Sequence, residues 1–138
     1  MSADVSSLSS ALNDLSAQEL SAAYRDKRLS PVEVTQAVIA HIERWEPKLQ
    51  ATWLFRPEAA LEQARASEAR WQCGEALGPL DGVPATIKEN IATRGDPMPA
   101  GTAAVDLKPA GADAPPGAPL KEGGAVIVRK TTMADYGM

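Results

Sequence analysis

The chain has 138 residues, of which 44% are hydrophobic and 23% charged, the balance of one soluble globular domain. Its net charge of -4 and its lack of a basic cluster exclude a typical nucleic-acid-binding face. With one cysteine, Cys73, and one histidine, His41, neither a disulfide nor a metal or cofactor site is expected. No apolar run is long enough to cross a membrane and the N-terminus lacks an apolar signal core, so we expect a cytoplasmic protein.

The chain begins with a polar, serine-rich stretch, and residues 1–13 are expected to form a flexible leader. Ser16 and Glu19 have the spacing of a capping box, which predicts a helix to about Lys27. The apolar residues expected on its buried side are Leu15, Leu20 and Tyr24.

A second helix is predicted from Ser30, because Pro31 suits a first helical turn and Glu33 completes another capping box. Its apolar stripe is expected to consist of Val34, Val38, Ile42 and Trp45. Pro47 is expected to end this helix.

A third helix is predicted for the alanine-rich residues 57–71, whose small side chains allow a neighbouring element to approach closely. Gly74, Gly78 and Pro79 then break the chain. Up to this point the sequence carries no chemical signal.

The second half of the chain predicts strands. Asp81-Gly82 indicates a turn, and residues 83–88 alternate apolar and polar side chains with the period of a strand. Residues 93–119 are typical of a loop, and residues 125–128 form a short apolar run that predicts a second, buried strand. We therefore expect an α/β fold with N-terminal helices followed by the first strands of a mixed sheet. Two strands do not form a stable sheet, so the sheet is expected to be incomplete in this chain.

The candidate catalytic residue is Lys88, at the end of the first predicted strand. Taken alone, a lysine in this position is most often a solvated side chain. A catalytic role requires burial, because loss of hydration lowers a lysine pKa and leaves a neutral amine that can accept a proton. Glu89 follows directly and, if paired with Lys88, would hold it charged and oppose that role.

The segment 78–90 resembles the amidase-signature pattern G-P-L-x-G-[IV]-P-x-x-[IVL]-K-[DE]-N. In that family the lysine of this pattern belongs to a Ser–cis-Ser–Lys triad. The resemblance therefore implies that Lys88 is the general base of an amide hydrolase. It would accept the proton that the cis-peptide serine relays from the nucleophilic serine, and an acyl-enzyme would form as ammonia or an amine leaves.

The resemblance continues on both sides of this motif. It includes the helix opening at residues 29–33, the small-residue turn at 101–103, and residues 124–133, which resemble G-A-x-[IV]-[IVL]-x-K-T-N-M. Residues 14–138 are accordingly identified as the N-terminal part of an amidase-signature domain.

The sequence departs from the family at several positions. Ser67 is the last serine and precedes the motif, so neither triad serine can be assigned, and the isolated chain is expected to be inactive. Gly117 and Pro119 fall where the family has a helix, which predicts a short helix starting near Pro119 or none. Arg129 replaces a small residue before Lys130.

Three functions remain open. The first is an amidase acting on a small-molecule amide. The second is the subunit designated A of a glutamine-dependent amidotransferase acting on charged tRNA. The third is a non-catalytic remnant or interaction module. We expect no direct binding of nucleic acid or membrane. Association into a homo-oligomer, or completion by a missing C-terminal part, would cover the unpaired strand edge.

Overall fold

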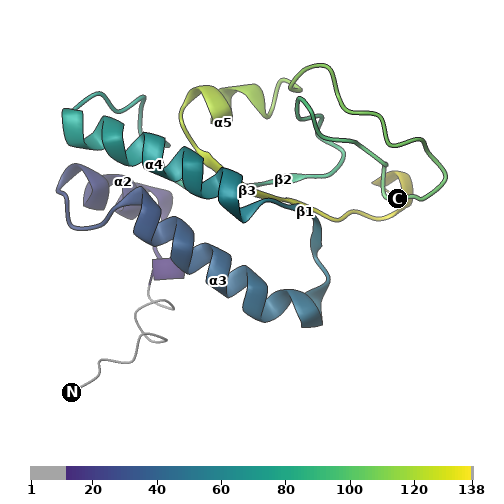
Figure 1. Cartoon of the computed structure of the whole chain (residues 1–138), viewed down its shortest axis with the longest axis horizontal. Helices are drawn as coiled ribbons and strands as arrows, with labels where there is room; N and C mark the ends of the chain where they lie inside the picture. Colours follow the sequence, from purple (N-terminus) through teal and green to yellow (C-terminus); the bar gives the residue numbers. More distant parts are fainter. Residues whose placement is uncertain (1–11, 138) are drawn as a thin grey trace.

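A computed structural model describes residues 12–137 of the chain (Figure 1). Of the predicted leader, residues 1–11 lie outside this range. The elements in chain order are α2 (Ala17–Arg25), α3 (Pro31–Leu49), β1 (Thr52–Phe55), α4 (Pro57–Cys73), β2 (Pro84–Lys88), α5 (Ala118–Glu122), β3 (Val126–Thr131) and the 3₁₀ turn η1 (Asp135–Gly137). The α/β class expected from the sequence is confirmed.

Both predicted capping boxes are present. The Ser16 hydroxyl accepts the Glu19 N–H at 3.3 Å, and the Glu19 carboxylate accepts the Ser16 N–H at 2.8 Å. Ser30 and Glu33 make the same pair of bonds at the start of α3, with Pro31 in the first turn. Each box satisfies N–H groups that a helix start leaves free, so the two helices begin where the sequence predicts.

The predicted end of α3 is wrong. The helix continues through Pro47 to Leu49, and it ends where Gln50 adopts a left-handed conformation and donates its N–H to the Glu46 carbonyl at 2.9 Å. A proline in the last turn removes only one helical hydrogen bond, so the left-handed residue decides the end. Trp45 is also 38% exposed rather than part of the buried stripe.

Helix α4 confirms the predicted third helix and ends at Gly74, which has the left-handed conformation typical of a helix C-terminus. Ala60 and Ala64 on its inner side are fully buried. The absence of larger side chains there lets α3 and α4 lie side by side, as Figure 1 shows.

The sheet has three strands in the order β1-β3-β2, with β2 parallel and β1 antiparallel to the central β3. The two predicted strands are confirmed, but β1 was missed. Its four residues, Thr52–Phe55, lie between Pro47 and Pro57 and are too few to show a period. Only pairing with β3, about 75 residues further along the chain, makes them a strand.

The apolar core lies between the helices and the central strand. One cluster joins the two long helices to β3 through Ile39, Ile42, Ala60, Ala64, Val126 and Val128. A second cluster joins α2, α3 and the start of the motif segment through Leu20, Tyr24, Val34 and Val83. In Figure 1 the long loop and α5 lie on the side of the strands away from α3. The predicted shortening of the last helix is confirmed, since α5 has only five residues.

The Tyr24 side chain links α2 to the motif segment. It is 1% exposed, and its hydroxyl donates to the Gly82 carbonyl at 3.2 Å. Burial raises the pKa of this phenol well above its ordinary value of 10.0. The folded chain therefore holds the proton at pH values where the unfolded chain loses it, and stability falls as the pH rises above about 10.

We expect Tyr24→Phe to lower the free energy of unfolding by about 1 kcal/mol at neutral pH, the worth of a typical hydrogen bond. The variant should also lose less stability than the unchanged chain between pH 9 and pH 11. Urea unfolding at a series of pH values measures both effects. Equal losses in the two proteins would show that another group causes the alkaline sensitivity.

Candidate active site around Lys88

Lys88 is the last residue of β2 and lies opposite Thr131 of β3. The alternation predicted for this strand is confirmed, because Ile87 is buried while Thr86 and Lys88 are exposed. Since β2 is an edge strand, one of its sides has no neighbouring strand among residues 12–137. Within this same part of the chain the Lys88 ammonium makes no hydrogen bond or ion pair. The burial that a base role requires is thus not provided by the described residues.

Glu89 does not pair with Lys88. The carboxylate is 2% exposed, and its two oxygens accept the Gly101 N–H at 3.0 and 3.2 Å. Successive residues of an extended chain point in opposite directions, which separates the two side chains. The expected obstacle to a base role is therefore absent, and Glu89 instead fixes the long loop against the end of β2.

The backbone that follows Lys88 is tied to β3. The Glu89 N–H donates to the Thr131 carbonyl at 3.0 Å, and the Ile91 N–H closes a turn onto the Lys88 carbonyl at 3.0 Å. These two bonds give defined partners to the Lys88 carbonyl and to the N–H group of the next residue. The lysine therefore projects from a fixed strand end and not from a free loop.

Lys130 is a second lysine at this site, and no role was predicted for it from the sequence. It is 2% exposed, lies opposite Ile87 on β3, and its ammonium donates to the Ile91 carbonyl at 3.0 Å. Burial lowers its pKa, and the nearby carboxylates of Asp96 and Glu89 oppose this effect. The signal that could have revealed it is the alternation of β3, in which Lys130 falls on the same face as the buried Val126 and Val128.

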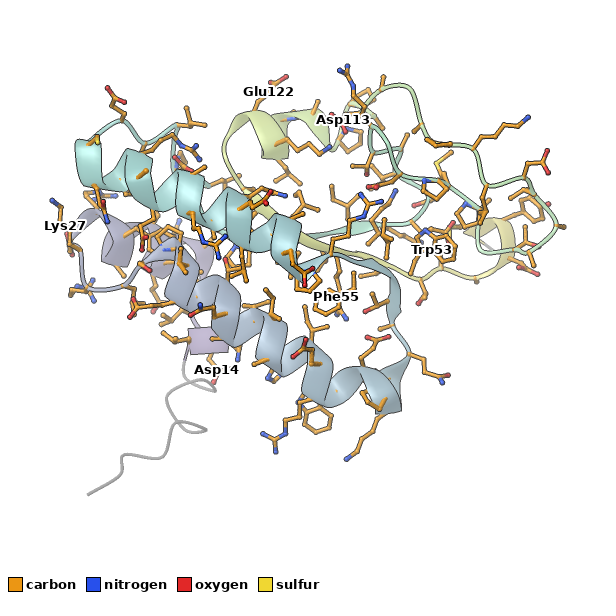
Figure 2. All side chains as sticks on the ribbon, in the orientation of Figure 1. Asp14, Lys27, Trp53, Phe55, Asp113 and Glu122 are labelled. Atoms are coloured by element: carbon orange, nitrogen blue, oxygen red, sulfur yellow. The ribbon has the colours of Figure 1, made fainter. Side chains whose placement is uncertain are left out.

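An apolar groove of about 420 Å³ lies at the same edge of the sheet. Its walls include Trp53 of β1, Glu89 after β2, Met133 after β3, and Gly101 and Leu107 of the long loop. Figure 2 shows Trp53 beside this loop, whereas Phe55 points toward the helices. Ligands of open α/β sheets bind outside the carboxyl ends of the strands, and both the groove and Lys88 lie at the carboxyl ends of β2 and β3.

The other residues considered from the sequence lie away from this edge. Ser67 is buried in α4, next to Pro31 and Gly82. His41 is exposed on α3, and Cys73 is exposed at the end of α4. Residues 12–137 contain no group of three His, Cys, Asp or Glu side chains that could hold a metal ion. No helix in this range combines the length and apolar character needed to span a membrane.

Arg129, the residue that departs from the family pattern, has a structural partner. Its guanidinium lies 3.3 Å from the Glu46 carboxylate and donates to the Thr52 hydroxyl at 2.9 Å. The same carboxylate accepts the Thr52 N–H and hydroxyl. The large side chain is therefore accommodated by the end of α3 and the start of β1.

Comparison with known proteins shows which family the chain belongs to. The sequence pattern that defines the family described as Amidase matches residues 33–138, more than half of the chain. The chain belongs to the amidase signature family.

The relatives of this family member include proteins named for an amidotransferase. The chain is 37% identical over 131 residues to the subunit designated A of the glutamyl-tRNA(Gln) amidotransferase of Chloroflexus aurantiacus, covering 92% of this chain and 26% of that protein. It is 35% identical over 112 residues to the corresponding protein of Trichodesmium erythraeum, covering 81% and 23%. The amidase-family chain thus spans about a quarter of the length of these relatives.

Solved structures confirm the fold. The native peptide amidase of Stenotrophomonas maltophilia superimposes with a TM-score of 0.80 at 27% identity, covering 89% of this chain and 26% of that one. A bacterial aryl acylamidase of the amidase signature family gives 0.77 at 28% identity, covering 88% and 26%. The helices, the strands and their order are therefore those of one part of a larger amidase fold.

Proposed function

We propose that this chain is the lysine-bearing part of an amide hydrolase and that Lys88 is its general base. The observation that carries the proposal is the motif at residues 78–90, which ends a parallel strand with Lys88 at the edge where the apolar groove lies. The family match over residues 33–138 supports the same chemistry.

The proposed reaction follows the triad of the family. The Lys88 amine, when neutral, takes a proton from a relay serine, which takes one from the nucleophilic serine. The nucleophile attacks the amide carbonyl, ammonia or an amine leaves, and water then releases the acid from the acyl-enzyme. Because Lys88 is exposed among the described residues, we infer that a further part of the protein or a partner covers it and supplies the two serines.

The test is an assay of the protein encoded by the complete reading frame that contains these 138 residues. Release of ammonia from a panel of carboxamides is expected, and Lys88→Ala should lower kcat by about 10²–10⁴-fold because it removes the general base. Lys108→Ala is the matched control, since Lys108 is an exposed lysine of the long loop. Undiminished turnover in Lys88→Ala would refute the role assigned to this residue.

A second function within the family is favoured by the relatives named for the glutamyl-tRNA(Gln) amidotransferase. In this case glutamine would be the productive amide of the panel, and activity would depend on charged tRNA together with a copurifying partner protein. Hydrolysis of several unrelated amides by the protein alone would instead favour a free-standing amidase. Failure of every amide, with or without partners, would favour the non-catalytic alternative.

A further inference from the structure

Lys130 is a buried ammonium group that the proposed reaction does not use. The other lysines of residues 12–137 are exposed or half-buried, whereas Lys130 is 2% exposed. Burying a charge is strongly unfavourable unless hydrogen bonds and opposite charges compensate. Here the compensation comes from the Ile91 carbonyl at 3.0 Å and from the nearby carboxylates of Glu89 and Asp96.

These partners all belong to the segment that follows the candidate base. The Ile91 carbonyl that Lys130 binds is three residues after Lys88, and the Ile91 N–H is bonded to the Lys88 carbonyl. Residue 131, next to Lys130, accepts the Glu89 N–H. Two successive residues of β3 therefore hold the turn at residues 88–91 from both of its ends.

The charged group formed by Lys130, Glu89 and Asp96 extends to the apolar groove. Glu89, which lies near the Lys130 ammonium, accepts the Gly101 N–H at the groove wall. Gly101 itself packs tightly, since a Cβ at this position would lie 2.5 Å from the Ala134 carbonyl oxygen. The buried charge thus connects the turn after Lys88 with the loop that lines the groove.

We propose that Lys130 is a positioning residue for Lys88. It fixes the backbone of residues 88–91 and thereby the direction in which the Lys88 amine projects from β2. The kinetic part of this inference rests on the proposed role of Lys88, whereas the structural part does not. Lys130 contacts no reacting atom and acts only through the turn.

The first test measures hydrogen exchange of backbone amides in the 138-residue chain. Lys130→Met removes the ammonium and keeps an unbranched apolar side chain of about the length of the lysine's methylene chain. We expect exchange at the Glu89 and Ile91 amides to become about tenfold faster or more. The Lys130 ammonium would no longer hold the Ile91 carbonyl, so the turn that contains both amides would open more often. The amides of Ala64 and Ser67, in the middle of α4, should keep their protection and show that the variant is folded.

The matched control is Lys121→Met. Lys121 is a half-buried lysine of the nearby helix α5, and it pairs with Asp113. Exchange at Glu89 and Ile91 should stay unchanged in this variant. Should Lys130→Met perturb the whole core, Lys130→Gln keeps a polar side chain without the charge and is expected to show the local increase alone. Unchanged exchange at Glu89 and Ile91 in Lys130→Met would overturn the inference.

The second test uses kinetics of the protein from the complete reading frame. Lys130→Met is expected to lower kcat about 100-fold with little change in KM, because small misplacements of a catalytic group reduce the rate by this order. In a Lys88→Ala background the same change should have no further effect. A kcat equal to that of the unchanged protein, or a full additional loss in the Lys88→Ala background, would overturn the positioning role.

The two failures are distinguishable. If Lys88→Ala leaves activity intact, the proposed function fails, and the exchange experiment still decides whether Lys130 holds the turn. If Lys88→Ala abolishes activity and Lys130→Met does not reduce it, only the positioning role fails.

Discussion

Replacing Asp81 by alanine is expected to lower the free energy of unfolding by about 3 kcal/mol or more, because it breaks a buried ion pair. The Asp81 side chain is 0% exposed. Its carboxylate accepts two bonds from the Arg70 guanidinium, at 2.6 and 2.8 Å, and the Leu77 N–H at 2.9 Å. Removing it leaves these donors without their acceptor and opens space beside Gly124.

The contribution of Asp81 to the free energy of unfolding should depend on pH. Burial raises the pKa of this carboxyl, but the bonds from Arg70 and Leu77 outweigh it, and the pKa lies below its ordinary value of 3.8. The stabilisation is therefore complete above this value and is lost as the pH falls through the lower pKa of the folded chain. Urea unfolding of Asp81→Ala and of the unchanged chain at neutral and acidic pH measures the difference.

The control for this prediction is Asp106→Ala. Asp106 is 88% exposed and lies 3.8 Å from the exposed Lys108, so its loss should change stability by less than about 0.5 kcal/mol. Similar losses in the two variants would contradict the assigned importance of the buried pair.

Replacing Gly82 by alanine is expected to lower the free energy of unfolding by about 2–5 kcal/mol, the sum of a backbone cost and an overpacking cost. Gly82 has a φ of 81°, which L-residues rarely adopt. A Cβ here would also lie 2.6 Å from the Ser67 hydroxyl oxygen and 2.7 Å from Cγ of Pro31. The contacts come from α4 and α3, so the new methyl group would separate the motif segment from both helices.

Gly74→Ala separates the two contributions. Gly74 has a φ of 75°, close to that of Gly82, but a Cβ there meets nothing within 4 Å. Gly74→Ala should therefore lower the free energy of unfolding only by the backbone cost, about 1–2 kcal/mol. If thermal or urea unfolding shows equal losses for Gly74→Ala and Gly82→Ala, the packing argument at Gly82 is incorrect.

Asp81→Ala and Gly82→Ala test motif residues that have structural roles. Asp81, Gly82, Val83 and Ile87 have packing or hydrogen-bonding partners that explain why those residue types stand there. Lys88 has no such partner among residues 12–137. Lys88, to which the family resemblance assigns catalysis, is therefore not explained by a hydrogen bond or ion pair of its side chain in this part of the chain.

Local signals in the sequence determined the starts of the main helices and the two longer strands. Capping boxes act over three residues, alternation in β2 acts within five, and a glycine ends α4 by its own conformational freedom. The motif at residues 78–90 identified Lys88 for the same reason, because it is contiguous. None of these features needs knowledge of a distant segment.

Only the tertiary structure decided the rest. Strand β1 exists because β3, far along the chain, pairs with it. The burial of Lys130 results from packing of the loop after β2 against β3, which no local pattern specifies. Burial and pairing depend on residues far apart in the chain, and these interactions determine which of the two lysines is covered and which is exposed.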